Sequence, residues 1–277
     1  GRPNKCYWPQ VDVQSTDYNK IFSSLYERLT DGFILKGYFK KPVNSRRQTE
    51  YFPFVYSKLL QRRIFFSECF RTNPRKQRDF LDCYLTSYFN AWLDYQNLYL
   101  RGKKYCVGFT PRINMYQKSL KGFFNDYPDG YLITIVRHPA AWYTSARRHN
   151  QRKYGHINEA IDLWKSSALS SLASKNKFKD KVILLIFEDM VANIGETMRF
   201  ICRILKIDWD DILEKPTFNS IPILANSSYA IQKHGVLKDV SGRWKSELNQ
   251  DEKEFIKNNA LDVYRKCLKV SRESLMI

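Results

Sequence analysis

The sequence predicts an α/β protein in which helices flank a central parallel sheet. The first observation is the run "KVILLIF" at residues 181–187, which is almost continuously apolar, as expected of a parallel strand buried on both faces. The second is the alternation of short apolar runs with segments of helical periodicity between about residues 104 and 206. Such alternation is typical of β-α units that build a parallel sheet.

The first half of the chain combines turn signals with two amphipathic patterns. Residues 1–75 mix aromatic and polar side chains around "KKPVNSRR" and "RTNPRK", and we expect them to be irregular. Apolar spacing predicts a helix from about residue 80 to 99 and another over 113–124, which the turn "NDYPDG" ends. Between these two helices, "KYCVGF" at 104–109 is a candidate for a short strand.

The second half contains the stronger signals. "YLITIV" at 131–136 predicts a strand, and Pro139 is well placed in the first turn of the helix that follows. Further helices are predicted over 157–175 and 194–206, the second with Asn193 and Glu196 spaced as a capping box. A last amphipathic helix is predicted over 251–269. We expect residues 1–277 to form a single domain.

Composition restricts the class of protein. Hydrophobic residues make up 43% of the 277 residues, which excludes general disorder, and no run of 18 uncharged apolar residues is available to span a membrane. Lys and Arg total 46 against 28 Asp and Glu, a net charge of +18. This excess favours an anionic partner such as nucleic acid, a phosphorylated cofactor, an acidic glycan or a membrane surface, although a basic solvated surface is an alternative. The six cysteines lack metal-ligand spacing, so we expect no metal and no disulfide framework, with Cys202 on an apolar helix face.

The segment "YLITIVRHPAAWYTSARR" at 131–148 carries the candidate site. Ligands of open parallel sheets bind at the carboxyl ends of the strands, and Arg137 stands at such an end. The following helix start offers N–H groups and a partial positive charge to an anion, which a guanidinium can also grip. Ser145 lies under two turns into that helix, and Arg147 and Arg148 add positive charge. The alternative is an arginine that binds backbone carbonyls and a serine on a solvated face.

Four segments in order resemble the PAPS-dependent sulfotransferases. "VRHPAAWYTS" resembles the segment that holds the 3′-phosphate of the nucleotide in that family, with a serine eight residues after the arginine. "GFTPRINMYQKSLKGFFNDYPDG" resembles the approach to that strand, and "VILLIFEDM" resembles the strand that ends in Y-E-D-L. "LANSSYAIQKHGVLKDVSGRWKSEL" resembles the late loop that closes over the nucleotide. The resemblance covers roughly residues 105–270 and implies a sulfotransferase fold related to the P-loop kinases.

The resemblance implies roles for particular residues. Arg137 and Ser145 would bind the 3′-phosphate, and Lys238 is a weaker candidate for the same anion. Arg243 would lie near phosphate, with Gly242 in the same loop and Trp244 packed near the adenine, although Trp244 could equally be a core residue. Phe187 stands where the family often has tyrosine, while Glu188 and Asp189 are interpreted as acidic residues flanking a helix. The series Asn226, Ser227 and Ser228 matches a structural element of the loop and is favoured as such over a glycosylation site.

The chain also departs from the family pattern. The N-terminal loop that resembles "PRSGTT" and cradles the 5′-phosphosulfate is absent, so we expect a fold that lacks its first β-α unit, through truncation or an error in the gene model. Phe109 replaces a lysine that many members carry before T-P. The catalytic residues are left unassigned. Candidates for the general base are Asp12 and Glu68 in the expected acceptor region of residues 1–75, with His149 and His156 expected to face solvent.

The predicted function is the transfer of a sulfonate from PAPS to a hydroxyl or amine acceptor, with an acidic glycan among the candidate acceptors and no nucleic acid expected as partner. Two alternatives stay open: a nucleotide-binding relative that does not catalyse, and a basic module that binds nucleic acid through its charge and aromatic residues. A cytoplasmic enzyme fits the scattered cysteines, and a Golgi enzyme that has lost an upstream anchor would have the same sequence features.

Overall fold

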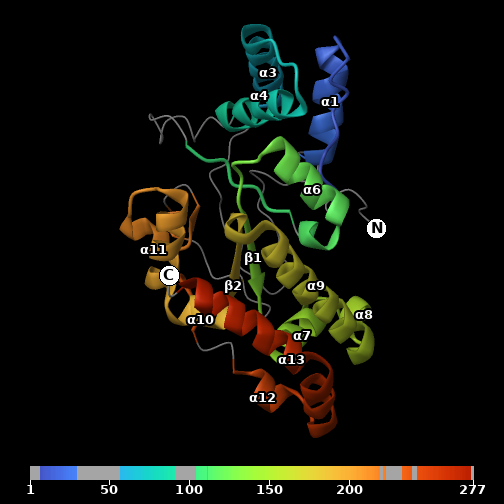
Figure 1. Ribbon diagram of the computed structural model, residues 1–277, viewed down its shortest axis with the longest axis vertical. Coiled ribbons are helices and arrows are strands. Elements are labelled where there is room, and N and C mark those ends of the chain that lie inside the picture. The colour runs from blue at the N-terminus through green and yellow to red at the C-terminus, as the bar shows by residue number, and fades with distance from the viewer. Residues whose placement is uncertain are drawn as a thin grey trace. The chain divides into compact units, whose positions relative to one another are not determined.

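A computed structural model describes residues 7–29, 57–91, 104–110, 112–218, 221–222, 233–238 and 242–275. The chain divides into two compact units, Gly1–Pro128 and Asp129–Ile277, which we call unit 1 and unit 2 and describe separately. Figure 1 labels their helices and strands. Among the described residues, no helix combines the length and apolarity needed to cross a membrane.

Unit 1 is helical. Its elements are α1 (Tyr18–Leu29), α3 (Lys58–Thr72), α4 (Gln77–Asn90), the 3₁₀ turn η2 (Ile113–Met115) and α6 (Gln117–Asp126). The expectation that residues 1–75 are irregular is therefore wrong for α1 and α3. In α3 the buried stripe consists of Gln61, Phe65 and Cys69, spaced four residues apart, and the polar glutamine within it obscured the apolar period.

Two further predictions in unit 1 are corrected. The helix predicted over residues 80–99 begins earlier, at Gln77, and also ends earlier, at Asn90, with Ala91 as its C-cap. The segment 104–110 contains no strand. Its Val107 and Phe109 side chains are 84% and 92% exposed, and no neighbouring strand pairs with it among the described residues of this unit.

The core of unit 1 lies where α1, α3 and α4 pack together. Aromatic rings dominate it, with Phe22, Phe65 and Tyr84 in mutual contact. Trp8 packs edge-on against Phe123 of α6, and its indole N–H donates to the carboxylate of Asp126 at 2.6 Å. Aromatic residues of α1, α3 and α4 thus contribute to a helical core in this unit.

Unit 2 contains the predicted parallel strands. Strand β1 (Leu132–Val136) pairs in parallel with β2 (Val182–Ile186), in a register that runs from Leu132↔Val182 to Val136↔Ile186. A short antiparallel pair joins β3 (Thr217–Phe218) and β4 (Ile221–Pro222). The fold is thus α/β, as predicted, and is mostly helical with a small parallel sheet.

Helices surround the two parallel strands. In chain order they are α7 (Pro139–His149), α8 (Gln151–Tyr154), α9 (Ile157–Phe178), η3 (Lys179–Lys181), α10 (Phe187–Ala192), α11 (Ile194–Leu205), η4 (Asp211–Glu214), α12 (Trp244–Glu247) and α13 (Gln250–Leu275). The predicted helices over 157–175, 194–206 and 251–269 are confirmed as α9, α11 and α13.

The predicted capping box is wrong: Asn193 precedes α11, but its side chain makes no cap hydrogen bond. Its backbone N–H donates instead to Asp189, because α10 continues almost directly into α11.

Strand β2 is buried on both faces, as its composition predicts. Leu184 and Ile186 belong to one cluster with residues of α9 and α13. Ile183 and Leu185 point to the other face and pack with Phe200 and its neighbours on α11. The strand is therefore the central layer between two sets of helices.

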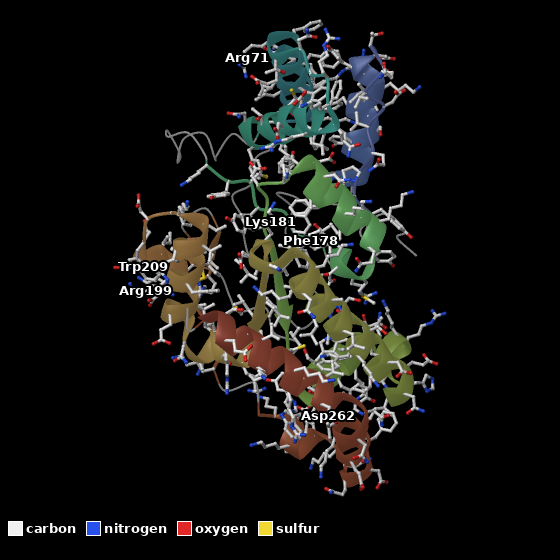
Figure 2. The ribbon with its side chains drawn as sticks, viewed as in Figure 1. Arg71, Phe178, Lys181, Arg199, Trp209 and Asp262 are labelled. Carbon is white, nitrogen blue, oxygen red and sulfur yellow. The ribbon has the colours of Figure 1, made fainter. Side chains whose placement is uncertain are left out.

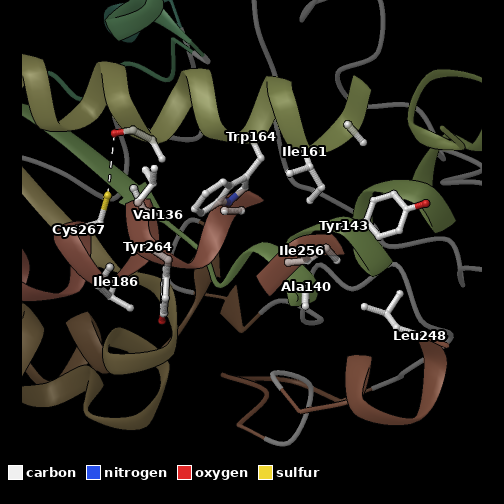
Figure 3. Packing of buried hydrophobic residues seen from close by; sticks show 14 of the residues in the cluster. Val136, Ala140, Tyr143, Ile161, Trp164, Ile186, Leu248, Ile256, Tyr264 and Cys267 are labelled. Atoms are coloured by element: carbon white, nitrogen blue, oxygen red, sulfur yellow. Dashed lines mark hydrogen bonds between the residues drawn. The ribbon is translucent and has the colours of Figure 1, made fainter. Parts of the chain in front are cut away.

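The larger cluster surrounds Trp164 of α9, which is 5% exposed (Figure 3). Figure 3 shows Trp164 beside Val136 of β1 and Tyr264 of α13. Cys267 is fully buried there, with its sulfur 3.9 Å from the carbonyl oxygen of Ala168. Cys202 is also buried, as predicted, and no disulfide joins the described cysteines.

We predict that Leu184→Ala and Leu185→Ala each lower the free energy of unfolding by about 2–5 kcal/mol, because each creates a cavity on one face of β2. Chemical denaturation with a fluorescence readout would measure both changes. Leu169→Ala on α9 is the matched control, since that side chain is 44% exposed; it should lower stability by under about 1 kcal/mol. A small effect at either strand position would contradict burial on both faces.

Candidate functional site

The site begins where β1 passes into α7. Arg137 is the residue after β1, and its carbonyl oxygen accepts a hydrogen bond of 3.0 Å from the indole N–H of Trp164. Because Trp164 is locked in the core, this bond fixes the backbone at the strand end. The position of Arg137 is thus set by packing.

Glu188 is the second anchor of this corner. It lies in the first turn of α10, directly after β2, so the two strand ends bring it to the same sheet edge as Arg137. Both of its carboxylate oxygens lie 3.1 Å from the backbone N–H of His138, and Oε2 also accepts from the Tyr264 hydroxyl at 3.2 Å. The N–H of His138, which the sequence suggested for a bound anion, therefore already donates to a carboxylate of the protein.

The Arg137 side chain lies between the carboxylate of Glu188 and the ring of Phe187. Its Nε is 4.0 Å from Glu188 Oε1, and its guanidinium carbon lies 4.7 Å from the centre of the Phe187 ring. One fifth of the side chain remains exposed. Burial raises the pKa of Glu188, and the hydrogen bonds from His138 and Tyr264 together with the charge of Arg137 oppose this rise.

The late segment of the chain meets the same corner. Trp244 stacks on the imidazole of His138, with ring centres 5.0 Å apart and planes 15° apart, while Tyr264 approaches that ring edge-on at 5.0 Å. Gly242 and Arg243 immediately precede α12, and the carbonyl of Gly242 accepts from the Lys245 N–H. The structure thus brings Trp244 against the neighbour of Arg137, although more than a hundred residues separate them.

The other candidates lie as follows. Ser145 is half-buried on α7, and Lys238 is exposed. Arg147 forms an ion pair of 2.6 Å with Glu252, and Arg148 one of 3.3 Å with Glu247. The two arginines connect α7 to the C-terminal helices. Asn226, Ser227 and Ser228 lie outside the described residues.

The candidates for the general base are dispersed. Asp12 is exposed, and Glu68 pairs with Arg71 at 2.5 Å; both belong to unit 1. His149 and His156 are exposed, as predicted.

Residues of α11 line two cavities. One, of about 460 Å³, includes Asp189, Arg199, Arg203 and Arg272; the other, of about 500 Å³, again includes Arg199 and Arg203. The guanidinium carbon of Arg199 lies 3.9 Å from the centre of the Trp209 ring. Figure 2 labels both residues. Neither cavity is lined by Arg137 or Ser145.

Sequence reasoning missed the residues that hold the corner. Glu188 was interpreted as a helix-flanking acid, and Trp164 and Tyr264 only as parts of amphipathic helices. A signal for Glu188 was present, because a residue directly after a strand lies at the same edge as one directly after its parallel neighbour. The hydrogen bonds that the Trp164 indole and the Tyr264 hydroxyl donate have no comparable signal in the sequence.

The partly buried imidazole of His138 gives stability a pH dependence. Burial, and secondarily the charge of Lys245, lowers the pKa of His138 from its ordinary 6.5 to about 4. Between these values the unfolded chain binds more protons, so the free energy of unfolding should fall as pH falls. A fully buried imidazole with this pKa would lose roughly 3 kcal/mol, and solvent screening of the partly exposed ring reduces the loss to about 1–2 kcal/mol. His138→Phe keeps a ring against Trp244 and should lose this component, as thermal unfolding between pH 7 and pH 4 would show. His149→Gln is the control, and an equal loss there would contradict the assignment.

Comparisons with known proteins identify the family of this chain. No curated protein sequence matches the chain. Among solved structures it is similar to the "Sulfotransferase Domain from the Curacin Biosynthetic Pathway", with 14% identity and a TM-score of 0.44 over 74% of this chain and 79% of that one. The sequence profile described as the sulfotransferase family matches residues 35–211, which contain Arg137, Ser145 and Glu188 and end before Trp244. Since that match spans well over half of the sequence, the chain belongs to the sulfotransferase family.

Proposed function

We propose that the protein transfers a sulfonate group from PAPS to a hydroxyl or amine acceptor, and that Arg137 binds the 3′-phosphate of the nucleotide. The family match supports sulfonate transfer. The observation that carries the site assignment is the restrained, partly exposed guanidinium at the carboxyl end of a parallel strand. A fixed guanidinium offers parallel N–H donors to a phosphate without losing further side-chain entropy.

The surroundings of Arg137 fit a nucleotide phosphate in three respects. Its Nε lies 4.0 Å from Glu188, and the one fifth of the side chain that is exposed can be approached by an anion. Ser145 lies on the helix that begins at this corner and could donate its hydroxyl. Arg243 and Lys238 belong to the late segment whose Trp244 packs at the corner, so they would add positive charge near the same anion. Gly242 would allow the backbone of this segment to approach the nucleotide.

Catalysis would rest on position and charge. When bound, PAPS supplies the activated sulfonate. Arg137 and Ser145 would hold the nucleotide in register, and the cationic side chains would neutralise charge on the departing phosphate. A carboxylate or histidine must accept the acceptor's proton, and Asp12 and Glu68 of unit 1 remain the candidates we propose. An acidic glycan is the acceptor class that the charge of +18 favours.

We predict that 3′-phosphoadenosine 5′-phosphate stabilises the protein against thermal unfolding, by about 2.7 kcal/mol at a hundredfold excess over its Kd. Arg137→Ala should weaken this binding about tenfold to a hundredfold, because it removes charge-assisted hydrogen bonds of about 1.5–3 kcal/mol. Differential scanning fluorimetry and titration calorimetry would measure both effects.

Arg265→Ala is the matched control, since it removes the same charge from an exposed pair on α13. It should leave nucleotide binding unchanged. Equal loss in both variants would refute the site assignment. Nucleotide binding without sulfonate transfer to any acceptor would favour the non-catalytic alternative. Binding to a single-stranded oligonucleotide with a steep salt dependence, and without preference for the 3′-phosphate nucleotide, would favour the nucleic-acid alternative.

A further inference from the structure

Two cysteines from neighbouring helices meet inside unit 1. Cys69 lies in the last turn of α3 and Cys83 in the middle of α4, and they are 0% and 4% exposed. The thiol of Cys69 is hydrogen-bonded to the sulfur of Cys83. The Thr72 hydroxyl lies 3.4 Å from the same sulfur. The fold therefore places two thiols side by side before any reaction.

Rigid elements hold the pair. Helices α3 and α4 are joined by residues 73–76, where Asn73 adopts a left-handed conformation and donates its N–H to the carbonyl of Cys69. At the other end of the helix pair, the N–H of Ser57 donates to the carbonyl of Ala91. Both cysteines also belong to the buried aromatic cluster of unit 1. Little backbone motion is needed to bring the sulfurs together.

The two thiols differ in acidity. The hydrogen bond from Cys69, and secondarily that from Thr72, lowers the pKa of Cys83 against the opposing effect of burial. The same contact and burial raise the pKa of Cys69. This difference favours Cys83 as the attacking sulfur and Cys69 as the thiol that closes the disulfide.

We propose that Cys69 and Cys83 form a site of oxidative modification whose co-reactant is a hydroperoxide and whose product is an intramolecular disulfide. The Cys83 thiolate attacks one oxygen of hydrogen peroxide, the O–O bond breaks, and hydroxide leaves as Cys83 becomes a sulfenic acid. The Cys69 sulfur then attacks the Cys83 sulfur, and the sulfenic hydroxyl leaves with the Cys69 proton as water. The sulfur pair loses two electrons, which reduce the peroxide.

The burial of the pair selects a small oxidant. Larger disulfide reagents cannot approach a sulfur that is 4% exposed, whereas local opening of the last turn of α3 admits a molecule the size of peroxide. The resulting bond would close a loop between neighbouring helices and restrict the unfolded chain, so it should stabilise unit 1. The proposal is independent of sulfonate transfer.

The test uses the reduced full chain and hydrogen peroxide. Mass spectrometry should show the loss of two hydrogen atoms, and a non-reducing peptide map should link the Cys69 peptide to the Cys83 peptide. The Tm should rise, and dithiothreitol should reverse the rise. Exposed Cys106 is the internal reference, because its oxidation shows that the oxidant was active. Unlinked Cys69 and Cys83 under conditions that oxidise Cys106 would overturn the proposal.

Two variants test the order of the steps. In Cys69→Ala, the sulfenic acid of Cys83 should persist and be trapped by dimedone added together with denaturant, without a linked peptide. Cys267→Ala is the control, since that buried cysteine lies in unit 2, and it should form the link as the unaltered chain does. A link from Cys83 to any other cysteine would overturn the assignment. The unaltered chain decides the main question even if Cys69→Ala does not fold.

Discussion

The carboxylate of Glu188 joins three parts of unit 2 at one edge of the parallel sheet. It follows β2, accepts the N–H of His138 at the start of α7, and accepts the hydroxyl of Tyr264 from α13. Arg137 lies against it at the end of β1. A carboxylate at a helix N-terminus is favourable in itself, and here it also compensates a charge that would otherwise be buried beside the core. The Arg137 side chain lies between this carboxylate and the ring of Phe187, which both restrain its direction.

The arginines of unit 2 differ in role: some form ion pairs that stabilise helix packing, whereas Arg137 is the one we propose for ligand binding. Arg147, Arg148 and Arg272 each pair with a carboxylate of another element and so connect helices. Arg137 shares Glu188 with His138 and Tyr264, and one fifth of its side chain is exposed. The net charge of +18 can raise the local concentration of an anionic ligand, but the geometry at Arg137 would determine which ligand is held.

The sequence predicts the strand-to-helix corner because every part of its signal is local. The continuous apolar run of β2 and the proline at the start of α7 belong to short segments whose period or chemistry is specific. The helix α3 escaped prediction because the polar Gln61 occupies a buried position in it. In α1 the apolar period of Ile21, Phe22, Leu25 and Tyr26 was present and was overlooked. The exposed segment 104–110 was mistaken for a strand because an apolar run does not show whether a pairing partner exists.

The candidate site also combines features with a local sequence signal and features that depend on tertiary packing. Arg137 and Trp244 are proposed from motifs, and the structure places Trp244 against His138, the residue next to Arg137. The bonds from Trp164 and Tyr264 depend on how α9 and α13 pack, which periodicity does not specify. The predicted capping box at the start of α11 does not form because the backbone N–H of Asn193 already donates to the carbonyl of Asp189 in α10.

A crystal structure of the complex with 3′-phosphoadenosine 5′-phosphate would test the account most directly. The account predicts that the 3′-phosphate lies within hydrogen-bond distance of the Arg137 guanidinium and the Ser145 hydroxyl, while Glu188 still accepts the His138 N–H. A nucleotide phosphate bound at the arginines of α11, with Arg137 facing only Glu188, would contradict it.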